Sequence, residues 1–136
     1  MNPQRKIMKI YISQPVCGVG TPAIESKRER IKSLCRKAFT PDVEFIDQVN
    51  LPSIQFPPNT SINKKRITYI ARSIGMMADA DLIVFTDDPD AAIGTSVELL
   101  IAQKLDINHI YSGQLDEIIK FNKCREERKN ENSNSG

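Results

Sequence analysis

One glutamate and two aspartates that stand close together in the sequence carry the functional groups needed to bind or cleave a sugar. Glu98 closely follows Gly94, and Asp88 and Asp90 precede both residues in a run of turn-forming residues. Glycosidic bonds are commonly cleaved by two carboxyl groups, one acting on the sugar carbon and the other protonating the leaving group. We therefore consider Glu98 as a nucleophile or hydrogen-bond acceptor, with Asp90 or Asp88 as the acid.

An ordinary structural interpretation fits the same residues. Thr95-Ser96-Val97-Glu98 matches the capping box, in which a threonine caps a helix and the glutamate bonds back to the capping amide. Asp-Asp-Pro-Asp at 87–90 is also a common turn sequence, because aspartates bond their own backbone and proline presets the dihedral angle. The sequence leaves both interpretations open.

The elements around Glu98 would place it beside a ligand. The run LIVF at 82–85 predicts a buried strand, and the apolar spacing of residues 95–105 predicts a helix that follows it. Ligands of open α/β sheets bind outside the carboxyl ends of the strands, where the first turn of such a helix begins. The helix dipole favours an anion at this position, and Gly94 leaves the backbone open to close approach.

The rest of the chain alternates strands and helices. Apolar runs predict strands at 6–13, 43–47, 82–85 and 107–111, and helical spacing predicts helices at 24–39, 67–77, 95–105 and 115–124. Repeated strand–helix–strand units form right-handed crossovers and a parallel sheet. We predict the α/β class: a single-domain Rossmann-like (flavodoxin-like) three-layer sandwich with a parallel sheet of about four to five strands.

Two polar stretches interrupt this pattern. Residues 50–63 are rich in proline, serine, threonine and asparagine, which predicts a long excursion able to close over a ligand. Residues 125–136 contain no apolar side chain, so burial cannot offset the entropy cost of ordering them. We predict one domain at 1–124 and a disordered polar tail at 125–136.

Composition argues against several classes of function. No apolar run approaches the ~20 residues that span a membrane, and the N-terminus lacks the pattern of a secretory signal. The net charge is only +2, without basic residues interleaved with aromatics, so nucleic-acid binding has little support. The three cysteines are far apart and indicate reduced thiols. We expect a cytoplasmic protein that binds a small molecule and has no membrane or nucleic-acid partner, no metal and no cofactor.

A second polar group follows the first strand. Gly18 and Gly20 lie in the loop after that strand, and backbone amides of such a loop can hold a phosphate. Lys27, Arg28 and Arg30 begin the next helix. They would either reach a phosphate or form the solvated face of an amphipathic helix.

Two segments of the chain, KIYISQPVCG at 9–18 and ARSIGMMADADLIVFTDDPDAAIGTSVE at 71–98, resemble the nucleoside 2-deoxyribosyltransferase-like superfamily. The similarity is greatest to an uncharacterised phage and bacterial branch that opens with a YISGP or YISQP motif and carries RS, AD and G-x-x-x-E elements. The correspondence spans roughly residues 6–111. Several short motifs in the right order are more specific than any one of them.

The resemblance implies a catalytic role for Glu98. In the transferase family this glutamate attacks the anomeric carbon of a 2-deoxyribonucleoside, which gives a covalent deoxyribosyl-enzyme and a free base. Where relatives carry an aspartate before the central strand, this chain has Ser73, which cannot supply the charge of a carboxylate. The resemblance also implies that the subunits form a homo-oligomer.

We therefore expect a nucleoside or nucleotide at the carboxyl ends of the strands, with its N-glycosidic bond cleaved or transferred by Glu98. The alternative is a non-catalytic nucleotide-binding protein, a sensor or sequestering protein for a nucleotide-derived signal; an interaction scaffold is a third possibility. The expected ligand-binding residues are Tyr11, Ser13, Gln14, Gly18, Gly20, Arg28, Ser73, Gly94 and Thr95.

Overall fold

Strands and helices alternate along the chain, as the apolar spacing predicts. The computed structural model describes residues 7–15, 21–46, 51–86 and 88–134. Its elements, in chain order, are β1 (Lys9–Ser13), α1 (Thr21–Ala38), β2 (Glu44–Ile46), α2 (Ile62–Met77), β3 (Leu82–Phe85), the short 3₁₀ helix η1 (Pro89–Ala91), α3 (Ile93–Lys104), β4 (His109–Tyr111) and α4 (Gly113–Asn134).

The strands of the described residues form one parallel sheet of four strands in the order β2-β1-β3-β4. This confirms the predicted α/β class, and the order is that of the first four strands of a flavodoxin-like sheet. The central strands β1 and β3 are buried almost throughout, which explains their continuous apolar sequence. Parallel strands end at the same edge, so their carboxyl ends lie together.

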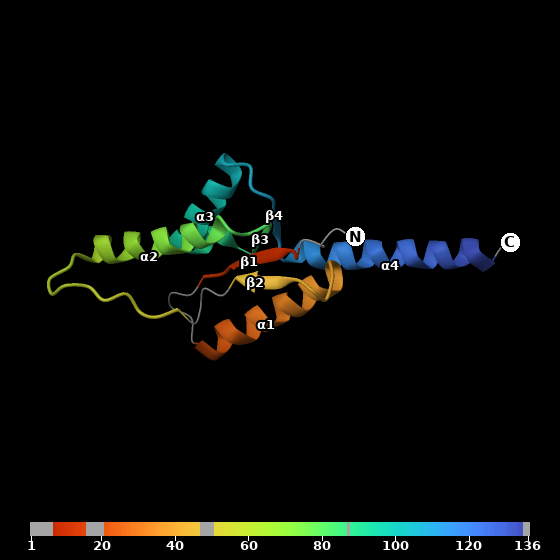
Figure 1. Ribbon diagram of the computed structural model, residues 1–136, viewed down its shortest axis with the longest axis horizontal. Helices are drawn as coiled ribbons and strands as arrows, with labels where there is room; N and C mark the ends of the chain where they lie inside the picture. Colours follow the sequence, from red (N-terminus) through yellow and green to blue (C-terminus); the bar gives the residue numbers. More distant parts are fainter. Residues whose placement is uncertain (1–6, 16–20, 47–50, 87, 135–136) are drawn as a thin grey trace, which may run out of the picture.

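Helices cover both faces of the sheet (Figure 1). On one face, α1 and α4 pack over Ile10, Ile12 and Val84. On the other face, α2 and α3 pack over a cluster that contains Tyr11 and Phe85. The alternation of side chains along β1 therefore sends Tyr11, and Ser13 after it, toward α2 and α3.

All four helices begin earlier than the sequence predicts, α3 and α4 by two residues and α1 and α2 by three or more. Helix α1 starts at Thr21 instead of residue 24, because Pro22 falls in its first turn, where a proline lacks only an amide that has no partner in the helix. Helix α2 starts at Ile62 instead of residue 67, with the Ser61 side chain accepting a bond from the Lys64 amide at 3.1 Å. The polar excursion is shorter as a result.

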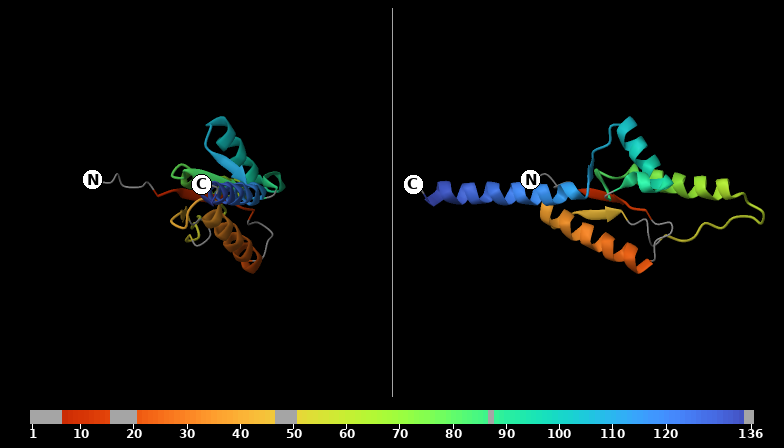
Figure 2. Two further views of the ribbon diagram at one scale, coloured as in Figure 1. Left: turned by 90° about the vertical axis from the view of Figure 1, so that its right-hand side faces the viewer. Right: turned by 180° about the vertical axis from the view of Figure 1, so that it is seen from behind.

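The residues before α2 run alongside that helix, and we call residues 51–60 the strap. Tyr69 Oη accepts a hydrogen bond from the Ile54 amide at 3.2 Å, and Arg72 donates to the Pro52 carbonyl at 2.8 Å. The Phe56 ring meets the Tyr69 ring edge to face at 5.8 Å between centroids. The strap and the first turns of α2 extend past the carboxyl ends of the strands (Figures 1 and 2).

The C-terminal helix differs from the prediction. Helix α4 continues to Asn134, where the sequence predicted a disordered tail from residue 125. Arginine, glutamate and lysine are good helix formers, and Glu126 stands three residues before Lys129, the spacing and order of a favourable pair. Residues 123–131 are exposed on all sides, and the helix projects beyond the sheet (Figure 1). None of the helices in the described residues is both long enough and apolar enough to cross a membrane.

Removing residues 125–136 should therefore cost little stability. The Asn122 side-chain amide donates to the Ala38 carbonyl at 3.0 Å, and the residues that follow it, 123–131, are exposed. We expect the truncated chain to lose helical signal in circular dichroism while its free energy of unfolding in urea changes by less than about 0.5 kcal/mol. A large loss of stability would mean that the projecting turns have a partner.

Candidate functional site

Polar side chains from β1, α2 and α3 meet at the carboxyl end of β1. Tyr11 and Ser13 of β1 are fully buried, and Glu98 of α3 is 5% exposed. The Tyr11 hydroxyl donates to Glu98 Oε1 at 3.3 Å. Ser73 of α2 lies close enough to this phenol for its hydroxyl to lower the pKa of Tyr11. Four residues that belong to different sequence motifs thus lie together. We call this group the Glu98 cluster: Tyr11, Ser13, Ser73 and Glu98.

Two oxygens of the Glu98 cluster have unused hydrogen-bonding capacity. Glu98 Oε2 and Ser13 Oγ are buried and have no hydrogen-bond partner within bonding distance in the described part of the chain. The Ser13 hydroxyl is nevertheless near enough to lower the pKa of the Glu98 carboxyl. A buried polar atom without a partner costs free energy, so such atoms are rare in native structures, and a bound molecule or a catalytic role is one explanation for them.

The environment of Glu98 makes its carboxyl group a weaker acid than an ordinary glutamate. Burial raises its pKa from 4.5 to about 7, and the Ser13 and Tyr11 hydroxyls offset only part of this rise. Burial and the nearby Glu98 charge likewise raise the pKa of Tyr11 well above its ordinary value. Glu98 therefore changes its charge near neutral pH, as a catalytic carboxyl group often does.

The capping-box interpretation of Glu98 is wrong. Helix α3 begins at Ile93 with Ala92 as its N-cap, and no side chain bonds to the capping position. Thr95 lies inside the first turn, and its hydroxyl donates to the carbonyls of Pro89 and Ala92 at 2.5 and 3.2 Å. Glu98 consequently lies in the second turn, where the helix dipole acts weakly, and its side chain faces β1. Thr95 has a structural role in joining η1 to α3.

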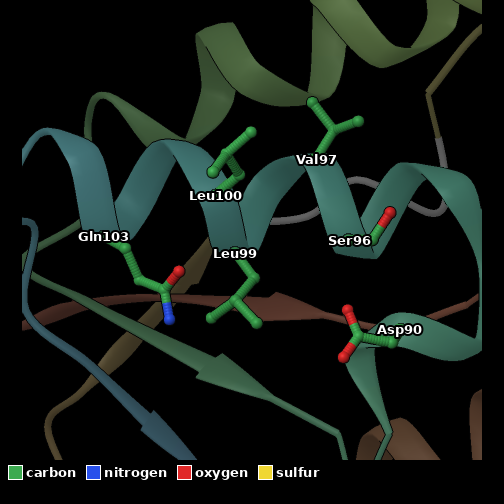
Figure 3. A pocket seen from close by; sticks show the side chains of 6 residues that line it. All are labelled: Asp90, Ser96, Val97, Leu99, Leu100 and Gln103. Carbon is green, nitrogen blue, oxygen red and sulfur yellow. The ribbon is translucent and has the colours of Figure 1, made fainter.

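Neither of the two candidate acids, Asp88 and Asp90, belongs to the Glu98 cluster. Asp88 is exposed, and its carboxylate accepts from the Asp90 amide at 3.2 Å, which starts η1 as the turn interpretation predicted. Asp90 is exposed and lines an open depression of about 350 Å³ on α3 together with Ser96 and Leu100 (Figure 3). Glu98 lies about 200° around the helix axis from Ser96, so Asp90 and Glu98 are on opposite faces of α3.

Helix α1 contributes two contacts near the cluster. Arg28 is 4% exposed, donates to the Ile46 carbonyl at 3.0 Å, and its positive charge lowers the pKa of Tyr11. This burial excludes the interpretation of Arg28 as part of a solvated face. Gln14 donates to the Ile24 carbonyl at 3.1 Å, and its buried Oε1 has no partner among the described residues.

The glycines of the prediction are only partly described. Gly18 and Gly20 lie outside the described residues, as does Asp87. At Gly94 a Cβ atom would meet nothing within 4 Å, so the fold itself does not require a glycine there. In the described part of the chain, no group of three or more His, Cys, Asp or Glu side chains is arranged to hold a metal ion.

Replacing Tyr11 with phenylalanine tests how Glu98 is held. Tyr11→Phe keeps the ring in the core but removes the hydroxyl that stabilises the carboxylate, so we expect the pKa of Glu98 to rise above 7. Titration of the Glu98 carboxyl carbon by NMR measures this change. Ser73→Ala is the control, because Ser73 contacts Tyr11 and not the carboxylate. An unchanged or lower titration midpoint in Tyr11→Phe would contradict the assigned hydrogen bond.

Comparison of the chain with protein-family models, with curated proteins and with solved structures found no match. The sheet and the burial of Glu98 define the class of this protein: a Rossmann-like α/β domain with a buried carboxyl group at the carboxyl end of its sheet.

Proposed function

We propose that this protein binds a nucleoside or nucleotide at the Glu98 cluster and cleaves or transfers its N-glycosidic bond, with Glu98 as the nucleophile. One observation carries the proposal: Glu98 is buried, one of its oxygens is held by Tyr11, and the other has no partner among the described residues. Burying the Glu98 carboxyl group in this way lowers the stability of the protein, and Glu98 does not cap helix α3. Such a cost is commonly retained where a residue performs chemistry.

The nucleoside class comes from the sequence motifs. The YISQP motif contains Tyr11 and Ser13, and the G-x-x-x-E element ends at Glu98. All three residues belong to the Glu98 cluster. These motifs are similar to those of the nucleoside 2-deoxyribosyltransferase-like superfamily. Since a fold hosts many functions, the likeness supports a ligand class only together with the site residues.

The proposed reaction needs Glu98 as an anion. Its free oxygen attacks the anomeric carbon, a carbon–oxygen bond forms, and the bond from that carbon to the base nitrogen breaks. The base leaves with the electron pair and takes a proton from water. A second water molecule, or another base, then attacks the same carbon and releases Glu98. Tyr11 fixes the carboxylate through its hydrogen bond, and burial excludes bulk water from the attacking oxygen.

A second candidate function is binding without turnover. Asp88 and Asp90, the carboxyl groups proposed to protonate the base, are exposed, and Asp90 is on the opposite face of α3 from Glu98. Ser73 supplies a hydroxyl instead of a second charge. In this alternative Glu98 accepts a hydrogen bond from a sugar hydroxyl, and the protein senses or sequesters a nucleotide-derived signal.

One experiment distinguishes these functions. The purified chain is screened by thermal shift against 2′-deoxynucleosides, ribonucleosides and their 5′-monophosphates, and the samples are then analysed by chromatography for free base. A raised melting temperature with released base supports cleavage, and a raised melting temperature with intact ligand supports binding alone. If no compound raises the melting temperature and no base is released, the proposed function is wrong.

A further inference from the structure

Three buried oxygen atoms at the carboxyl end of β1 have no hydrogen-bond partner among the residues that the structure describes. They are Ser13 Oγ, Gln14 Oε1 and Glu98 Oε2. Ser13 is fully buried, and Gln14 and Glu98 are each 5% exposed. Ser13 ends β1 and Gln14 follows it, so their α-carbons are about 3.8 Å apart. Several unpaired oxygens at one edge of the sheet lower the stability of the ligand-free protein, and one bound molecule could pair with all of them.

These oxygens require hydrogen-bond donors from whatever binds to them. The Gln14 nitrogen donates to the Ile24 carbonyl of α1 at 3.1 Å, so the unpaired atom of this amide is its oxygen, which only accepts. An ionised Glu98 also only accepts, and the Ser13 hydroxyl accepts through its lone pairs. A phosphate dianion carries no donor and is repelled by a carboxylate. The sugar hydroxyls of a nucleoside are suitable donors.

The face of the sugar that Glu98 attacks determines which hydroxyls lie near it. A retaining nucleophile approaches the anomeric carbon from the side opposite to the leaving group, which here is the base. On that side a ribonucleoside carries its 2′- and 3′-hydroxyls, whereas a 2′-deoxyribonucleoside carries the 3′-hydroxyl alone. Tyr11 holds Oε1 of Glu98 and Oε2 forms the new bond, which leaves Ser13 Oγ and Gln14 Oε1 for the sugar. Two acceptors match the two hydroxyls of ribose, and a deoxyribose would leave one of them unpaired.

The surroundings of the two acceptors distinguish them. The Ser13 hydroxyl is near enough to Glu98 to lower the pKa of its carboxyl group. It therefore suits the 2′-hydroxyl, because C2′ is bonded to the anomeric carbon that Glu98 attacks. Gln14 is anchored to α1, in the layer opposite α3. Its oxygen suits the 3′-hydroxyl, one carbon farther from the reacting centre.

We propose that this site selects ribose: Ser13 Oγ binds the 2′-hydroxyl, and Gln14 Oε1 binds the 3′-hydroxyl, of a ribonucleoside or its 5′-monophosphate. The inference rests on the proposed function, since it names the sugar that the Glu98 cluster takes. It departs from the family resemblance, which implies a 2′-deoxyribose. Because a buried acceptor left unpaired weakens binding, each missing hydroxyl should weaken binding by at least about tenfold.

Nucleoside analogues test this selection on the unmodified protein. Isothermal titration calorimetry compares adenosine, guanosine, cytidine, uridine and their 5′-monophosphates with the corresponding 2′-deoxy compounds, and then with the 3′-deoxy and arabino forms of the preferred base. The arabino form keeps a 2′-hydroxyl but turns it to the face that carries the base. It should therefore bind as weakly as the 2′-deoxy form. Where base is released during the titration, kcat/KM replaces the dissociation constant.

Two variants test which residue binds which hydroxyl. Ser13→Ala removes only the Oγ atom, so it should abolish the preference for ribose over 2′-deoxyribose and keep the preference over 3′-deoxyribose. Gln14→Met keeps the length of the side chain and should do the reverse. The matched control is Ser96→Ala, the same substitution on the face of α3 opposite Glu98, which should leave both preferences unchanged. Circular dichroism verifies that each variant is folded.

Failure of this inference is distinguishable from failure of the proposed function. If no nucleoside or nucleotide binds, the proposed function is wrong and the selection of ribose is wrong with it. If 2′-deoxy or arabino forms bind as tightly as the ribo forms, the proposed function stands and the selection of ribose is wrong. A preference that survives the variant designed to abolish it would overturn the assignment of Ser13 or Gln14 to that hydroxyl.

Discussion

Replacing Glu98 with glutamine should make the protein more stable by up to about 3 kcal/mol at pH 8 and by almost nothing at pH 4.5. Each pKa unit corresponds to about 1.4 kcal/mol, so the rise in the pKa of Glu98 from 4.5 to about 7 corresponds to roughly 3 kcal/mol. Glutamine has the same shape and never ionises. The expected gain is therefore the cost of holding a buried carboxylate.

The direction of this pH dependence follows from proton binding. Between pH 4.5 and 7 the folded chain holds a proton on Glu98 that the unfolded chain has lost, so wild-type stability falls as pH rises through this window. Above pH 7 both states are ionised and the full cost is present. Below pH 4.5 both are protonated and the cost is absent.

Urea unfolding of wild type and Glu98→Gln from pH 4.5 to 8.5 measures the difference. The matched control is Glu117→Gln, the same substitution at an exposed position of α4, which should give no comparable trend. A difference that stays constant with pH, or a less stable glutamine variant at pH 8, would show that Glu98 is not buried in a costly state.

If the protein releases base from a nucleoside, Glu98→Gln should reduce that release by at least about 10³-fold, because the amide cannot act as the nucleophile. In the wild type, kcat/KM should rise about tenfold per pH unit below pH 7 and level off above it, since only the carboxylate attacks. Assays of released base across this range measure both effects.

The control for this second prediction is the measured stability of the Glu98→Gln variant. Glu98→Gln should be at least as stable as wild type, so lost activity cannot be attributed to unfolding. Turnover that survives the substitution would remove Glu98 from the chemistry. The midpoint of the activity profile should coincide with the upper end of the pH window in which stability falls, because both report the pKa of Glu98 in the folded, ligand-free protein. An activity midpoint far from that pH would mean that another residue controls the rate.

The sheet could be predicted because its strands carry the pattern of burial in their own sequence. Leu82–Phe85 is apolar at every position because both faces of β3 are covered. This pattern can be recognised in the sequence without knowing which elements cover the strand. Helix ends were less predictable. Residues 125–134 were expected to be disordered for lack of apolar side chains, yet good helix formers extend α4 into solvent.

The Glu98 cluster was predictable in membership but not in geometry. Tyr11 and Ser13 stand two apart on a strand, so the period of the strand puts them on one face, and Glu98 follows the next strand of the sheet. The position of Asp90 depends instead on η1, a turn created by the Asp88 side chain and Pro89 before the helix begins. Local spacing gave no indication of which face of α3 that turn would reach.

The way in which the strap is attached has a consequence for how this protein can diverge during evolution. Tyr69 and Arg72 bind the amide of Ile54 and the carbonyl of Pro52, atoms that nearly every amino acid provides. Mutations in residues 51–60 can therefore accumulate without loss of these two anchors. We expect related chains to keep the tyrosine and arginine while the sequence that they hold drifts.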